Sequence, residues 1–162
     1  MRKEKDMTTE KRKHLAAWFS IILIFVTLAS LFYIVKEENH KCTGGKEMIA
    51  LGCDHGGYEL KQEIIKYLEE HNLEYKDFGC DSMDSTDYPI YAKRVAIAVQ
   101  SGDCEKGILV CGTGIGISIT ANKFKGIRAA LCSDCFSAEA TRLHNNANIL
   151  AMGGRVVGPG LA

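Results

Sequence analysis

From Lys46 onward, short apolar runs alternate with longer amphipathic segments, and this alternation constrains the fold more than any other feature of the sequence. Such a pattern is typical of βα units that build a parallel sheet. Gly, Asp or Ser residues bound the apolar runs, as expected for short buried strands. The sequence therefore predicts five strands, at residues 48–53, 75–79, 107–111, 127–132 and 149–153.

The segments between these runs have apolar residues at helical spacing. They predict crossover helices at residues 58–71, 90–100, 115–124 and 136–145, and Pro89 marks the entry of the second helix. Crossovers between parallel strands are right-handed, so this order predicts an α/β fold: a three-layer α/β/α sandwich around a five-stranded parallel, Rossmann-like sheet. Ligands of such sheets bind at the carboxyl ends of the strands.

A different pattern precedes the predicted sheet. The 21 residues from Leu15 to Val35 carry no charge, which is enough to cross roughly 30 Å of hydrocarbon as a helix. Trp18 and Tyr33 lie near the ends of this segment, where interfacial aromatic residues are favoured. Residues 1–46 are thus predicted to be a charged N-terminus, one transmembrane helix at 15–35 and a short linker. A cleaved leader, or a fused segment unrelated to a domain that starts at Met48, are the alternatives.

The charges and cysteines give opposite indications of location. Six Lys and Arg residues precede the predicted span and three follow it before residue 47, so the positive-inside rule places the globular part outside the cytoplasm. The seven cysteines are odd in number and lack the spacing of a disulfide scaffold, which favours reduced thiols in a cytosolic protein. Basic and acidic residues number 20 each, so nucleic acid is not an expected partner.

The segment CGTGIGIS, residues 111–118, follows an apolar strand and opens a helical pattern. Glycines in such a turn let backbone N–H groups converge on an anion, and the helix N-terminus adds positive potential. A plain tight turn is one alternative. A dinucleotide site is another, because GTGIG resembles GxGxxG and Asp134 lies 22 residues beyond Gly112. That fingerprint belongs on the first strand of a domain, whereas this segment follows the third.

Cys111 is the candidate reactive group of this turn. A thiol beside a helix N-terminus is expected to have a pKa below the usual value of about 8.5, which would make it a base near neutral pH. The alternative is a small buried apolar residue, the interpretation given to Cys53, Cys80, Cys104 and Cys132. The pair Cys132 and Cys135 forms a CxxC motif, but no second such motif exists, so neither a metal nor a redox cofactor is predicted.

Together these segments resemble ribose-5-phosphate isomerase type B, in a family that includes galactose-6-phosphate and allose-6-phosphate isomerases. The resemblance begins at Met48 and leaves out residues 1–46. It rests on GCDHGGYELK (52–61), DYP (87–89), ILVCGTGIGISITANK (108–123), GIRAALC (126–132) and HNNANILAMGGRVVGPGLA (144–162).

The resemblance implies an aldose-ketose isomerase of the pentose phosphate pathway, cytoplasmic and homodimeric, that interconverts ribose 5-phosphate and ribulose 5-phosphate through an enediolate without a cofactor. Cys111 is the implied proton shuttle, His144 assists ring opening, and Thr113 completes the catalytic set. The resemblance implies that His55 and Arg155 contact the phosphate and that the backbone amides of residues 112–116 hold the oxyanion. The full set of implied substrate contacts is Asp54, His55, Tyr88, Gly112, Gly114, Ile115, Gly116, Asn145 and Arg155.

Chains of this family continue past Ala162 with a helix and tail that carry further phosphate-binding arginines and part of the dimer contact. The resemblance therefore implies an isomerase domain at residues 47–162 that is truncated at its C-terminus. Because a phosphate dianion would lose bidentate arginine partners, weak or absent activity is expected of this chain.

Overall fold

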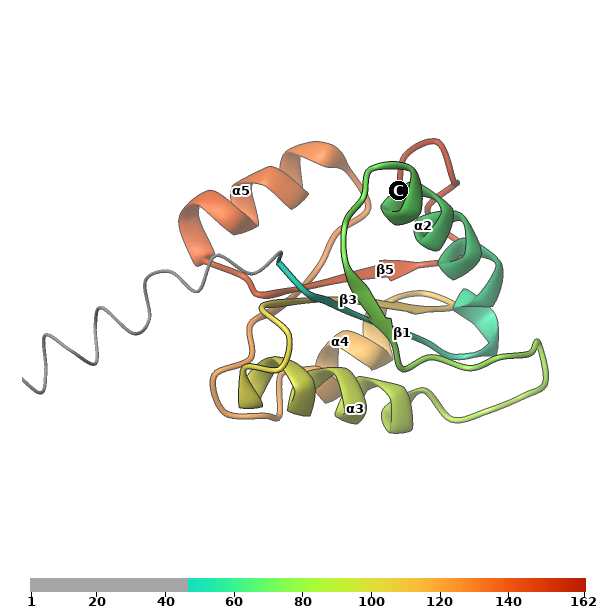
Figure 1. Cartoon of the computed structure of the whole chain (residues 1–162), viewed down its shortest axis with the longest axis horizontal. Coiled ribbons are helices and arrows are strands. Elements are labelled where there is room, and N and C mark those ends of the chain that lie inside the picture. Colours follow the sequence, from blue (N-terminus) through green and yellow to red (C-terminus); the bar gives the residue numbers. More distant parts are fainter. Residues whose placement is uncertain (1–46) are drawn as a thin grey trace, which may run out of the picture. The chain divides into compact units, whose positions relative to one another are not determined.

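Five parallel strands form the centre of the structure, a computed structural model that describes residues 47–162 (Figure 1). Their order across the sheet is β2-β1-β3-β5-β4. The strands are β1 (Ile49–Cys53), β2 (Tyr75–Asp77), β3 (Lys106–Cys111), β4 (Ala129–Leu131) and β5 (Ile149–Gly153). The helices are the short 3-10 helix η1 (His55–Gly57), α2 (Tyr58–Glu70), α3 (Tyr88–Ser101), α4 (Ile115–Ala121) and α5 (Cys135–Asn145).

The central strands end at the same edge of the sheet. Cys53 of β1 is in register with Val110 of β3, and Cys111 of β3 is in register with Gly153 of β5. We call the edge formed by these strand ends the carboxyl edge. Because β3 lies between β1 and β5, the turns that follow these three strands are neighbours there.

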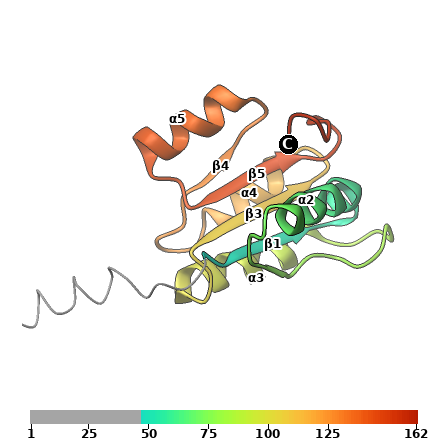
Figure 2. The ribbon, with the colours of Figure 1, turned by 45° about the horizontal axis from the view of Figure 1, so that its top comes forward.

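Helices cover both faces of the sheet, which gives the predicted three layers (Figures 1 and 2). On one face, α3 and α4 pack against β3 and β5 through a core that includes Val95, Leu109, Ile117 and Ile149. On the other face, α2 packs through Leu60, Ile64 and Leu68. Helix α5 lies on the same side as α2 but has no buried residue.

The predicted elements are confirmed, with shifts at their ends. Strand β4 is shorter than the predicted 127–132, and α4 ends at Ala121 where the sequence predicted 124. The end of α4 and the start of β4 are joined by the Asn122 side chain, which accepts from the N–H of Ala129 at 2.9 Å and donates to its C=O at 2.7 Å. The chain therefore turns between α4 and β4 through Gly126, whose φ of 83° suits a residue without a Cβ.

The predicted transmembrane helix at residues 15–35 lies outside the described residues. Between residues 47 and 162, the structure has no helix that is long and apolar enough to cross a membrane.

Candidate active site

Three turns meet at the carboxyl edge: residues 54–57 after β1, 112–116 after β3 and 153–155 after β5. A Cβ atom added at Gly56 would lie 3.0 Å from the backbone nitrogen of Gly112, and one added at Gly154 would lie 2.7 Å from the C=O oxygen of Gly56. The Arg155 N–H also donates to the Gly112 C=O at 3.1 Å. Glycine is needed at these contacts because the backbones approach too closely for side chains.

Cys111 ends β3 and is 4% exposed, with its side chain in the core beneath α3 and α4. Its sulfur accepts a hydrogen bond from the Gly114 N–H at 3.1 Å. Gly114 has a φ of 76°, and a Cβ there would lie 2.4 Å from Leu131 Cδ1. The turn is therefore folded around the sulfur, and one of the amides expected to hold an oxyanion points at Cys111 instead.

Asp54 and His55 start the turn after β1 and have defined partners. Asp54, 6% exposed, accepts from the N–H groups of Gly56 and Gly57 at 2.9 and 3.1 Å and so caps η1. The Nδ1 atom of His55 lies 3.1 Å from the Thr86 backbone nitrogen and 3.2 Å from the Thr86 C=O oxygen. Both contacts hold the Nδ1 side of the ring against the Thr86 backbone, and the tautomer of the imidazole decides which of them is the hydrogen bond.

Other predicted site residues lie at the same edge. Tyr88, the first residue of α3, packs its ring against Gly116, since a Cβ there would lie 2.6 Å from the ring atom Cζ. Arg155 lies over Gly112, with its guanidinium carbon 3.9 Å from the corresponding Cβ position. Thr113 is exposed, and its hydroxyl oxygen lies 3.4 Å from the N–H of Ile115. Every predicted site residue except His144 and Asn145 therefore lies at the carboxyl edge.

His144 and Asn145 lie in the last turn of α5, away from the carboxyl edge. Helix α5 starts just after the carboxyl end of β4 and returns to the amino end of β5 (Figure 1). Its 11 residues cover about 16 Å at 1.5 Å per residue. The structure therefore does not bring His144 and Cys111 together within one chain. Asn145 instead lines a 350 Å³ pocket with Arg128 and Ala147 at the opposite edge.

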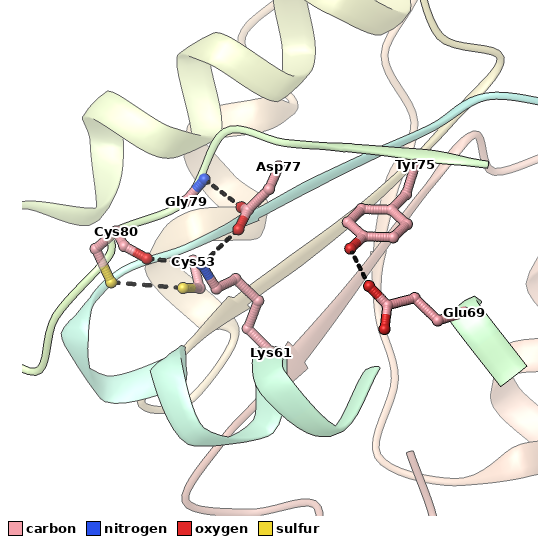
Figure 3. Close-up of polar contacts among 7 residues, drawn as sticks. All are labelled: Cys53, Lys61, Glu69, Tyr75, Asp77, Gly79 and Cys80. Atoms are coloured by element: carbon pink, nitrogen blue, oxygen red, sulfur yellow. Dashed lines mark hydrogen bonds and ion pairs between the residues drawn. The ribbon is translucent and has the colours of Figure 1, made fainter. Parts of the chain in front are cut away.

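Sequence reasoning missed a polar cluster behind the site, which Figure 3 shows. The buried ammonium group of Lys61 donates to Asp77 Oδ2 at 2.7 Å and to the Cys80 C=O at 2.6 Å. The sulfur atoms of Cys53 and Cys80 lie 3.5 Å apart. The sequence feature that could have indicated this cluster is Lys61, a charged residue that lies on the buried face of α2, one residue after Leu60.

The contacts of this cluster change the protonation of two groups. Burial, with the hydrogen bond to Cys80, raises the pKa of the Cys53 thiol far above its usual range. Burial opposes the charge of Lys61, but the hydrogen bond that Lys61 donates to Asp77 and the nearby negative charge outweigh burial and raise the Lys61 pKa. Cys132 and Cys135 of the CxxC motif differ in burial, the first buried and the second exposed, and both are free thiols.

Comparisons with known proteins agree with this arrangement. Residues 49–162 match the family model described as Ribose/Galactose Isomerase. The chain is 58% identical over 115 residues to the putative sugar phosphate isomerase YwlF of Bacillus subtilis, covering 70% of this chain and 77% of the relative. It is 56% identical over 114 residues to ribose-5-phosphate isomerase B of Escherichia coli, covering 70% and 76%.

A solved structure supports the same assignment. Ribose-5-phosphate isomerase B of Clostridium thermocellum superposes with a TM-score of 0.70 at 54% identity, covering 70% of this chain and 77% of that one. The glycine-rich turns of the carboxyl edge lie within the matched region. On its sequence and its fold, this chain belongs to the ribose/galactose isomerase family.

Proposed function

We propose that this protein is an aldose-ketose isomerase that interconverts ribose 5-phosphate and ribulose 5-phosphate, with Cys111 as the base. The observation that carries the proposal is the position of the Cys111 sulfur, at the carboxyl end of a central strand and 3.1 Å from the Gly114 nitrogen. An N–H group that donates to sulfur stabilises negative charge there, as a thiolate base requires. The family, and the named relatives within it, supply the substrate class.

The proposed reaction begins with ring opening to the free aldehyde. Cys111 then takes the proton from C2. The electron pair of the C–H bond forms a C1–C2 double bond while the carbonyl π pair moves to the C1 oxygen, which gives an enediolate. Return of the proton to C1, with transfer of the C2 hydroxyl proton to the C1 oxygen, gives the ketose. Backbone amides of residues 112–116 other than the N–H of Gly114 would stabilise the enediolate oxygen.

Charge and geometry suggest roles for the surrounding residues. His55 would contact a substrate oxygen through Nε2, because its Nδ1 is held by the backbone of Thr86. The guanidinium of Arg155, exposed above Gly112, would bind the phosphate. Asp54 and Thr113 would bind hydroxyl groups, and Tyr88 would form a wall of the pocket beside Gly116.

We further propose that His144 and Asn145 reach this site from a second copy of the chain. The topology supports this, because the two residues lie at the amino edge of the sheet while Cys111 lies at the carboxyl edge. The surface next to the Cys111 turn is apolar, with large exposed side chains at Ile115, Ile119 and Leu131. A patch of this kind is a suitable contact for a symmetric dimer.

Galactose 6-phosphate is the alternative substrate, because the family model covers ribose and galactose isomerases. An inactive relative is the other alternative. A panel of pentose and hexose phosphates distinguishes these cases, since turnover of one class identifies the substrate and turnover of none favours the inactive relative.

The test of the proposal is the variant Cys111→Ala, with Cys135→Ala as a control at an exposed thiol. Loss of the base should lower kcat by about 10²- to 10⁴-fold with unchanged circular dichroism, whereas the control should keep its turnover. Full turnover of Cys111→Ala would show that another group moves the proton.

A further inference from the structure

The thiols of Cys53 and Cys80 form a pair outside the proposed catalytic set. Cys53 is the last residue of β1 and has no exposed surface, and Cys80 follows β2 with 5% of its surface exposed. Their sulfur atoms are 3.5 Å apart, and in Figure 3 the two side chains point toward each other. Both thiols are free.

The backbones are also arranged for a covalent bond between the two residues. The Cys80 N–H donates to the Cys53 C=O at 3.1 Å, and the Phe78 N–H donates to the Leu51 C=O at 2.7 Å, so the pairing of β1 and β2 continues past Asp77. Neighbouring strands lie about 4.8 Å apart and rise about 3.3 Å per residue, so Cys80, one residue past the position opposite Cys53, has its Cα roughly 6 Å from that of Cys53. Disulfides span Cα separations of about 4.4–6.8 Å, so the sulfur atoms can bond through small side-chain rotations.

We infer that Cys53 and Cys80 are a site of oxidative modification, whose disulfide ties residues 81–87 to the end of β1 beside the active site. This segment includes Thr86, which holds Nδ1 of His55, and it leads into Tyr88 at the start of α3. Cys53 directly precedes Asp54 and His55. A bond between the two sulfur atoms therefore joins the two segments that position His55.

The two thiols differ in their access to an oxidant. Cys80 lies at the base of a loop in which Asp81 and Met83 are exposed, whereas Cys53 is fully buried and its pKa is raised by burial. Cys80 is therefore the first thiol to react with a peroxide. The ammonium group of Lys61, hydrogen-bonded to the Cys80 C=O, supplies a positive charge near both sulfur atoms.

The chemistry balances with hydrogen peroxide as the oxidant. Cys80 is oxidised to a sulfenic acid while the peroxide O–O bond breaks and one water forms. The Cys53 sulfur then displaces the hydroxyl group of the sulfenic acid, which leaves with the thiol proton as a second water. The two thiols lose two protons and two electrons in total, and a dithiol reductant reverses the change.

The test is to treat the full chain with hydrogen peroxide and map its peptides without reduction. The expected result is a cross-linked peptide pair containing Cys53 and Cys80, lighter by two hydrogens than the sum of its parts, and absent from Cys80→Ser. Amide hydrogen exchange in residues 81–87 should slow several-fold in the oxidised wild type and return on reduction. Absence of this cross-link, or a cross-link that leaves the exchange unchanged, overturns the inference.

The effect on turnover rests on the proposed isomerase function, whereas the peptide map and the exchange rates do not. If the chain is an isomerase, peroxide should lower the turnover of the wild type several-fold more than that of Cys80→Ser, and dithiothreitol should restore the difference. The Cys80→Ser variant corrects for direct oxidation of Cys111. If the chain has no turnover, the proposed isomerase function is wrong. The peptide map and the exchange rates then test the inference about Cys53 and Cys80 on their own.

Discussion

The Gly114 N–H donates to the sulfur of Cys111, and the glycine reaches this position only through a φ of 76°. Gly114→Ala should therefore destabilise the fold and lower turnover together. Gly126→Ala is the matched control, because Gly126 has a φ of 83° but no atom within 4 Å of an added Cβ.

In urea denaturation, Gly126→Ala should lose about 1–2 kcal/mol of unfolding free energy from conformation alone. Gly114→Ala should lose about 1–3 kcal/mol more, because its Cβ overlaps Leu131 and the backbone of Met152. Equal losses of unfolding free energy in the two variants would mean that the overlap of the added Cβ at Gly114 with its neighbours does not destabilise the fold.

A site shared between two chains predicts complementation between inactive variants. Cys111→Ala and His144→Ala should each lack turnover, but their mixture after unfolding and refolding should recover about a quarter of wild-type activity. Random pairing makes half of the dimers mixed, and each mixed dimer has one complete site of two. A mixture as inactive as its components would exclude a site built from both chains.

Lys61 stabilises the fold through an ion pair between its buried ammonium group and the partly exposed carboxylate of Asp77. Lys61→Met should lower the unfolding free energy by roughly 1–3 kcal/mol, because it leaves the buried Cys80 C=O without the Lys61 donor and removes the hydrogen bond to Asp77 Oδ2. Lys66→Met on the exposed face of the same helix should change it by less than about 0.5 kcal/mol. Similar denaturation midpoints for the two variants would contradict this role of Lys61.

Buried thiols predict a loss of stability in alkali. Burial raises the pKa of Cys104, so the folded state keeps its proton while the unfolded chain releases it above a pH of about 8.5. This contribution is fully present below that pH and is lost as the pH rises toward the folded pKa. Cys104→Ala should reduce the decline between pH 8.5 and 10 by up to about 1.4 kcal/mol per pH unit, measured by urea denaturation with reductant present. If the unfolding free energies of the wild type and Cys104→Ala fell in parallel over this pH range, the prediction would be wrong.

The sequence alone determined the parallel α/β sandwich, because strand and helix periodicities are local properties of neighbouring residues. The five strands and four crossover helices lie where the apolar runs and helical spacings predicted them, and Pro89 lies in the first turn of α3. Proximity to the carboxyl ends of strands also identified Asp54, Cys111 and Arg155 as neighbours. These residues immediately follow or end strands whose direction is fixed by the fold class.

Only the tertiary structure decided the remaining relationships, because they depend on the order of the strands and on contacts between distant segments. It places β5 between β3 and β4, and it separates His144 from Cys111 by the length of α5. It also brings Cys53 and Cys80, 27 residues apart in sequence, within 3.5 Å. No periodicity encodes such a contact, since the register of β1 against β2 arises from the packing of the whole sheet.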